Sequence, residues 1–146
     1  MKIPDSISVI QNQLAGDFEY LDDWEERYAY LMDLGKDVQG LSPEEKKPDN
    51  LIKGCQSRVW LTTRIENNRL WLSADSEAFI ARGIIALLIK VFSGQTPYDI
   101  LNETFDLPER IGLTAHLSPG RANGLNGMLS RIRHEATRAL NHTSHN

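Results

Sequence analysis

The single cysteine of this chain is the residue whose type and neighbours best support chemistry. Cys55 is the only cysteine among 146 residues, and it lies in the polar, cationic segment Lys53-Gly54-Cys55-Gln56-Ser57-Arg58. A thiolate is favoured near positive charge and hydrogen-bond donors, and the thiolate is the nucleophilic form of cysteine. Gly54 permits a tight turn that leaves the sulfur sterically open. The segment therefore predicts a reactive thiol on a loop, against the alternative of a small, inert, buried apolar residue.

Two further residues are candidates for the same site. We expect Arg121 at the third position of a helix capped by Ser118, where the helix dipole disfavours a cation. It could stabilise a thiolate, or it could be an ordinary surface arginine. His116 could act as a base, but a lone histidine near a helix start is more often a hydrogen-bonded structural residue, and we favour that interpretation.

The other residues around Cys55 are polar side chains without an obvious acid–base role. Gln56 and Ser57 are interpreted as groups that shape the loop and contact the sulfur. Asp75 and Ser76 are interpreted as caps of the helix that follows, with a role at a partner surface left open. No metal ligand is expected, because one cysteine excludes the multi-cysteine zinc and iron–sulfur frameworks; a mixed site with His or Asp is not excluded by counting.

Helical periodicity occurs in several segments that would position these residues. A capping box at Asp22 and Glu25 starts a helix that Gly35 should end, and a shorter helix precedes it, capped by Asp5 or Ser6. A strongly apolar helix follows residues 75–76, a short one starts at Thr96, and a long one carries apolar residues from Leu125 to Leu140.

The sheet signal is confined to residues 59–74. VWLTTRI and RLWLSA are rich in β-branched and aromatic residues, and the ENN between them predicts a hairpin turn. Leu51 and Ile52 could add a short third strand, and residues 36–50 should form a surface loop. Helices, a small antiparallel sheet of about three strands, and more helices predict an α+β fold in which the sheet packs against helices.

Composition limits the remaining choices. A length of 146 residues with 40% hydrophobic residues predicts one domain, residues 1–146, with a polar frayed tail from about residue 141. A net charge of −4 argues against nucleic-acid binding. No signal peptide is visible, and the longest apolar stretch, residues 83–89, is far shorter than a membrane span. We therefore expect a cytoplasmic protein without membrane contact.

Four blocks of the sequence resemble one family. The segment NLIKGCQSRVW closely resembles the signature of the SufE-like sulfur acceptors, a family that includes the acceptor of the Csd system. WEERYAYLMDLGK, SADSEAFIARGIIALLI and LTAHLSPGRANGLNGM resemble three of its helical blocks in the same order, so the resemblance extends from Trp24 to Met128. The chain has Ala74 where the family commonly has glycine, which does not affect capping by the two residues that follow.

The resemblance implies a fold and a function. The fold would be that of SufE and of the IscU-type scaffolds. The partner would be a pyridoxal-phosphate (PLP) cysteine desulfurase of the SufS or CsdA type, which holds sulfur as a cysteine persulfide. Cys55 would accept that sulfur. The protein would thereby stimulate the desulfurase and pass the sulfur to an iron–sulfur scaffold or another acceptor. Arg121 would lie near the cysteine loop. The chain itself would bind no PLP and have no independent turnover, and a homodimer is left open.

Two other functions compete with this interpretation. A stand-alone thiol enzyme, such as a peroxidase or a cysteine hydrolase, is weakened because the chain has no second cysteine and no Cys/His pair motif. A regulatory protein could instead bind a desulfurase without using its thiol. The absence of a second cysteine also suits a carrier, because no nearby thiol can attack the persulfide and release sulfide.

Overall fold

A two-stranded antiparallel hairpin forms the sheet of this protein. The computed structural model describes residues 3–144, and in it β1 (Val59–Glu66) pairs with β2 (Arg69–Ser76). The register places Val59 opposite Ser76 and Glu66 opposite Arg69. The turn residues Asn67 and Asn68 have φ values of 55° and 61°, the left-handed conformation that a two-residue hairpin turn requires and asparagine tolerates. The predicted hairpin and its turn are confirmed.

The third strand expected at Leu51 and Ile52 is only a single bridge. Leu51 pairs with Trp60 beside a one-turn helix, η1 (Pro48–Asn50), and a turn at Gly54 follows. The helix and the turn leave too little extended chain for a strand. The sheet therefore has two strands where about three were expected.

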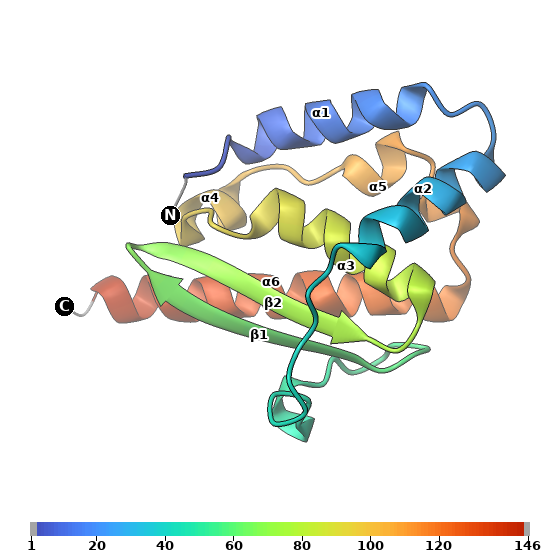
Figure 1. Cartoon of the computed structure of the whole chain (residues 1–146). Helices are drawn as coiled ribbons and strands as arrows, with labels where there is room; N and C mark the ends of the chain where they lie inside the picture. Colours follow the sequence, from blue (N-terminus) through green and yellow to red (C-terminus); the bar gives the residue numbers. More distant parts are fainter. Residues whose placement is uncertain (1–2, 145–146) are drawn as a thin grey trace.

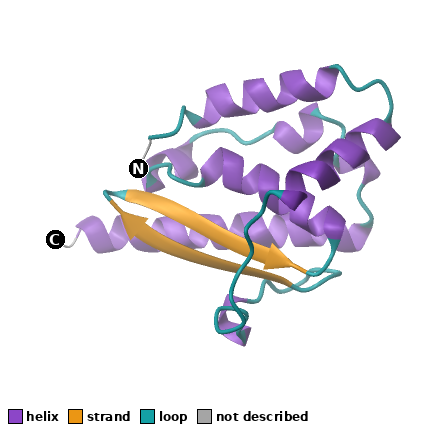
Figure 2. Cartoon of the chain, viewed as in Figure 1, coloured by secondary structure: helices purple, strands orange, loops and turns teal. Residues whose placement is uncertain are grey.

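Helices pack around the hairpin in an α+β arrangement, as predicted (Figures 1 and 2). The central helix α3 packs between β2 and α2, and α6 runs the length of the molecule on the other side of α3 from α1 (Figure 1). The elements other than the strands and η1 are α1 (Ile7–Glu19), α2 (Trp24–Lys36), α3 (Phe79–Phe92), α4 (Pro97–Asn102), α5 (Leu107–Arg110), η2 (Thr114–His116) and α6 (Pro119–Ser144).

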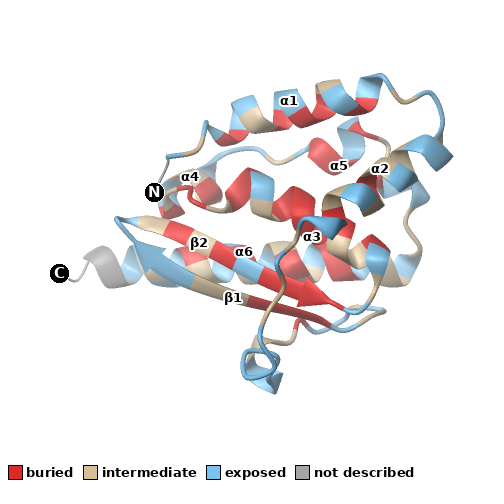
Figure 3. Ribbon diagram, viewed as in Figure 1, coloured by how far each residue is buried: buried red, intermediate tan, exposed pale blue. Residues whose placement is uncertain are grey.

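Burial is concentrated on α3 and on one end of the hairpin. Ile84, Leu87 and Val91 of α3 are buried, as their helical spacing predicts (Figure 3). Val59, at the start of β1, is buried with its neighbours, while the turn end of the hairpin is exposed. The chain enters β1 from the Cys55 loop, so the core provides a rigid support beside that loop.

Capping residues fix most helix starts near the expected positions. Ser6 and Thr96 cap α1 and α4 as predicted. The cap of α2 is displaced by one residue: the Asp23 carboxylate accepts from the Glu26 N–H at 2.8 Å, where Asp22 and Glu25 were expected to pair. At the other end of the chain, α6 extends to Ser144 and so includes residues 141–144 of the expected polar tail.

The helices α2 and α3 cross at two glycines. A Cβ atom added to Gly83 would lie 2.5 Å from the carbonyl oxygen of Leu31, and one added to Gly35 would lie 2.7 Å from the backbone nitrogen of Gly83. Both distances are too short for any side chain, and the obstructing atoms belong to the backbone. The two helix backbones therefore contact each other directly.

Candidate functional site

The Cys55 loop is a short segment closed at its base by the backbone. The Ile52 N–H donates to the Val59 carbonyl at 2.8 Å, so residues 53–58 form a loop between two fixed points. Gly54 has φ of +86°, a left-handed conformation that glycine adopts without strain. A Cβ atom on Gly54 would meet no atom within 4 Å. The glycine is thus needed for the turn and not for packing, as the sequence suggested.

A face of α6 without side chains lies beneath this loop. Gly120, Gly124 and Gly127 recur on one side of the helix and contact the loop. A Cβ atom on Gly124 would lie 3.3 Å from the Cys55 Sγ, and one on Gly127 would lie 3.0 Å from the Lys53 carbonyl oxygen. We call these three residues the α6 glycine face. It lets the cysteine lie against the helix.

The Cys55 side chain faces a cavity of about 20 Å³. Apolar residues Val59, Ile80, Ile84 and Met128 form much of its wall, and Ser57 and Arg121 also line it. A space of this size accommodates about one water-sized group. The thiol is half-buried, and this burial raises the pKa of Cys55 above the ordinary thiol value.

The cations near Cys55 in the sequence have other partners or are exposed. The Nε and Nη2 atoms of Arg58 donate to the two oxygens of the Glu77 carboxylate, at 2.8 and 2.5 Å. Arg121 lines the cavity, but its Nη1 donates to the Tyr28 hydroxyl at 3.2 Å. Lys53 is exposed. The expected cationic surroundings therefore do not lower the pKa of the resting thiol, which burial raises instead.

Ser118 connects the start of α6 to the loop. Its Oγ accepts from the Arg121 N–H at 3.3 Å, as the predicted cap requires, and donates to the Gln56 Oε1 at 2.9 Å. Gln56 thus shapes the loop through α6. The side chains of Gln56, Ser57 and Arg121 are brought together with Cys55 around one cavity.

His116 lies outside the group of residues that line this cavity. Its ring stacks on Trp24, with 4.2 Å between ring centroids and 12° between ring planes, and its Nδ1 lies 2.9 Å from the Gly112 carbonyl oxygen. These contacts support a structural role for His116, whose ring connects the segment before α6 to α2.

Asp75 and Ser76 end β2 and are buried; the residue at the N-cap of α3 is Ala78. Their predicted role as helix caps is therefore wrong. The Asp75 carboxylate accepts from the Leu41 N–H at 3.0 Å, pairs with Lys46 at 3.1 Å, and pairs with Arg82. Burial by itself would raise the pKa of Asp75, but the hydrogen bonds from Leu41, Lys46 and Ser76 outweigh it and lower this pKa.

The hydroxyl of Ser76 contacts the last residue of the Cys55 loop and the start of α3. It donates to the Arg58 carbonyl at 2.7 Å and accepts from the Ala78 N–H at 3.3 Å. Asp75 and Ser76 therefore fix the loop over residues 38–46 on one side and the end of the Cys55 loop on the other.

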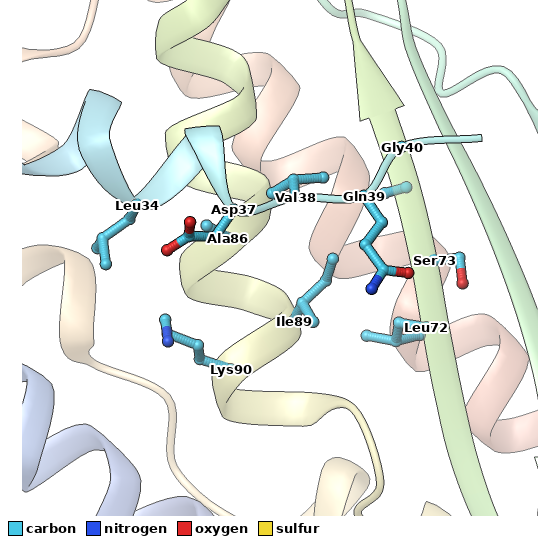
Figure 4. Close-up of a pocket in the computed structure, with 11 residues that line it drawn as sticks. Leu34, Asp37, Val38, Gln39, Gly40, Leu72, Ser73, Ala86, Ile89 and Lys90 are labelled. Carbon is cyan, nitrogen blue, oxygen red and sulfur yellow. The ribbon is translucent and has the colours of Figure 1, made fainter.

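A larger hollow of about 300 Å³ lies away from the thiol (Figure 4). It is bounded by the end of α2, by β2 and by α3, with Ile89 on its floor and Asp37 and Lys90 on its rim. No residue of the Cys55 loop lines it. Among the described residues, no three His, Cys, Asp or Glu side chains are grouped to hold a metal ion, and none of the described helices is long and apolar enough to cross a membrane.

Sequence reasoning missed the α6 glycine face and Tyr28. The spacing of Gly120, Gly124 and Gly127 is visible in the sequence, and glycines on one side of an expected helix indicate a close approach. No comparable signal identifies Tyr28, which lies 93 positions from Arg121 in the sequence.

Comparisons with known proteins agree with this geometry. Residues 12–136 match the SufE family, described as an Fe-S metabolism associated domain. An uncharacterized SufE-like protein of Rhizobium etli is 41% identical over 130 residues, covering 86% of this chain and 88% of the relative. A second, from Rhizobium meliloti, is 38% identical and covers 86% and 93%.

A solved structure shows the same fold. The solution structure of a hypothetical protein from Thermus thermophilus superimposes with a TM-score of 0.75 at 20% identity, covering 96% of this chain and 99% of that one. At that identity the likeness concerns the fold alone. The family match covers most of the chain, and the chain therefore belongs to the SufE family, whose domain is associated with Fe–S metabolism.

Proposed function

We propose that this protein is a sulfur carrier that takes sulfur from a PLP cysteine desulfurase onto Cys55 and passes it on, in the cytoplasm, for iron–sulfur cluster assembly. The observation that carries the proposal is the position of the thiol. Cys55 lies on a loop closed at its base, and its sulfur faces a mostly apolar cavity of about 20 Å³. That space is suited to about one further sulfur atom attached to Cys55.

The transfer step balances without an oxidant or a reductant. The Cys55 thiolate attacks the terminal sulfur of a cysteine persulfide on the desulfurase, and a new S–S bond forms on Cys55. The S–S bond of the donor breaks, and the donor cysteine leaves as a thiolate. The persulfide is then held by Cys55. The same exchange in the opposite sense delivers the sulfur to the next acceptor.

The resting position of Cys55 suits storage of sulfur better than reaction. Burial raises the pKa of the Cys55 thiol, so the resting sulfur is protonated and poorly nucleophilic. If the loop moves away from the α6 glycine face, the thiol regains water and its pKa falls toward the ordinary value. Reaction at the partner surface and storage against α6 therefore suit two positions of one loop. Removing sulfur from the donor would also free the desulfurase for its next turnover, which is how the carrier would stimulate it.

The central experiment measures sulfur on the intact chain. Wild type and Cys55→Ser are each incubated with a PLP cysteine desulfurase and cysteine, and their intact masses are then determined. We expect one added sulfur on wild type, removable by a thiol reductant, and none on Cys55→Ser. The desulfurase should also turn over faster with wild type than with Cys55→Ser.

The same experiment separates the competing functions. A wild-type chain that gains no sulfur would overturn the carrier proposal. Equal stimulation of the desulfurase by Cys55→Ser would instead support a thiol-independent regulator. Turnover of a peroxide or an ester by the protein alone, lost in Cys55→Ser, would support a stand-alone thiol enzyme.

A further inference from the structure

A groove with excess positive charge lies beside the Cys55 loop. It consists of two adjoining hollows, of about 550 and 590 Å³, between η1, β1 and α6. Both are lined by Asp49 and Arg131, so the hollows meet at these residues. We call the combined feature the Arg131 groove. Its charged residues are Lys47, Asp49, Lys53, Arg131, Glu135 and Arg138.

The charge of this groove is opposite to that of the whole chain. Four cations and two carboxylates line it, which leaves a net charge of +2, whereas the chain carries −4. Eight of the nine residues around the larger hollow are polar, and Leu61 is the exception. The larger hollow therefore favours an anionic, hydrogen-bonding occupant, and Pro48, Leu51 and Ile52 in the smaller hollow add an apolar contact nearer to Cys55.

Arg131 is held in place at the centre of the groove. Its Nη2 donates to the Asp49 carbonyl at 2.6 Å, and its Nε lies 3.5 Å from the Glu135 carboxylate. These contacts connect η1 to α6 and reduce the freedom that the guanidinium would lose on binding. Lys53 is exposed at the end nearest to Cys55 and lines the groove there.

The groove lies within the area that a partner at Cys55 would cover. Gly124, which contacts Cys55, and Arg131 are both on α6, seven residues apart, a rise of about 10 Å. A stable interface buries about 800 Å² on each partner, equivalent to a disc of about 16 Å radius. A protein centred on Cys55 would therefore reach Lys53 and Arg131.

We propose that the Arg131 groove docks an acidic segment of the cysteine desulfurase that delivers sulfur to Cys55. The inference rests on the proposed function, because that function requires a protein partner at the loop. Complementary charge would guide the desulfurase to the loop and fix its orientation, and the effect would weaken with salt.

Charge reversal in the groove tests this proposal against a matched control. Lys53→Glu with Arg131→Glu is compared with Lys36→Glu with Arg133→Glu, which has the same change in net charge outside the groove. Affinity for a PLP cysteine desulfurase is measured by calorimetry at about 20 and 300 mM salt. We expect the groove variant to lose about tenfold or more in affinity at low salt, with a smaller loss at high salt, and the control to stay within about twofold of wild type.

Further measurements separate this inference from the proposed function. Lys53→Gln with Arg131→Gln removes both charges without placing a new carboxylate beside Glu135, and it should lose less affinity than the double reversal. Its unfolding should stay cooperative, with a midpoint lowered only by the loss of the Arg131 contacts to the Asp49 carbonyl and Glu135. After prolonged treatment with excess inorganic polysulfide, every variant should carry the same added sulfur on Cys55, because this end point does not depend on how fast an anion approaches the loop. If both double reversals bind the desulfurase equally, the groove proposal fails while the carrier proposal stands. A nucleic acid is the other anionic occupant to test, and binding of an oligonucleotide is measured for the same variants. If the groove variant bound an oligonucleotide more weakly than wild type but bound the desulfurase equally well, the groove proposal would also fail.

Discussion

Glycines bring a neighbour close to a helix in two regions of this molecule, with different consequences. At the α2–α3 crossing, a Cβ atom on Gly83 would lie 2.5 Å from the Leu31 carbonyl oxygen, which belongs to the backbone of another helix. On the α6 glycine face, a Cβ atom on Gly124 would lie 3.3 Å from the Cys55 Sγ, the end of a side chain on a loop. The first contact joins two rigid elements, and the second places a movable element on a rigid one.

The difference shows how similar residues serve stability and function. The helices α2 and α3 could separate at the crossing only by disrupting the close-packed core around them, so this contact lasts as long as the core stays formed. The Cys55 loop is fixed only at its base and by a few contacts such as Ser118 to Gln56, so it can leave the α6 glycine face while the core stays intact.

Gly83→Ala should give the largest effect on stability. The added methyl group collides with backbone atoms that cannot move aside, an overpacking that costs about 1–3 kcal/mol and that we place at the upper end. Alanine offsets about 1 kcal/mol of this through its higher helix propensity. We expect the free energy of unfolding to fall by about 2 kcal/mol in urea denaturation.

The matched control is Gly16→Ala in α1, where a Cβ atom meets nothing within 4 Å. It should gain up to about 1 kcal/mol from helix propensity alone. If Gly83→Ala were as stable as Gly16→Ala, the direct contact between α2 and α3 would be ruled out.

Gly124→Ala should change the thiol more than the fold. The loop needs to shift by only a few tenths of an ångström, so the free energy of unfolding should stay within about 1 kcal/mol of wild type. Cys55 would move toward solvent, and its alkylation by iodoacetamide at neutral pH should accelerate at least about twofold. Gly16→Ala should alkylate at the wild-type rate. A stability loss as large as that of Gly83→Ala would show that the loop is held as firmly as the helix crossing.

The pH dependence gives a smaller effect on stability with a definite sign. Burial raises the pKa of folded Cys55, so its contribution to stability is complete below the ordinary thiol pKa of about 8.5 and is lost as pH rises toward the folded value. The stability of wild type relative to Cys55→Ser should therefore decline above about pH 8.5. Alkylation of folded wild type should have a midpoint above that of the urea-unfolded chain. A lower midpoint would instead indicate a thiolate stabilised by cations in the resting protein.

Local signals predicted much of the fold. The asparagines at 67–68 identify the hairpin turn because left-handed backbone suits few other residues, and Thr96 before a proline identifies the start of α4. The third strand failed because two apolar residues do not reveal that flanking turns confine them to one bridge. The extension of α6 over residues 141–144 could not be predicted, because the polar residues there carry no apolar helical pattern.

The site was only partly predictable, because its important contacts join distant parts of the chain. The loop glycine and the cap at Ser118 follow from neighbouring residues. The role of Asp75 does not, since its hydrogen bond to the Leu41 N–H crosses 34 positions in sequence. The position of Arg58 could not be predicted either. Its charge was expected near the Cys55 thiol, but its guanidinium pairs with the Glu77 carboxylate.

The backbone hydrogen bond between Ile52 and Val59 limits how far Cys55 can travel. Two residues lie between Ile52 and Cys55, so the two Cα atoms are three steps apart and at most about 10 Å apart when the chain is fully extended. The loop length therefore limits how far Cys55 can reach, so a protein that exchanges sulfur with Cys55 must bring its own sulfur to within about this backbone distance plus the length of the cysteine side chain from Ile52. A donor protein whose cysteine lies farther than this below its own surface must carry that cysteine on a flexible segment. A donor without such a segment cannot transfer sulfur to Cys55, however tightly it binds.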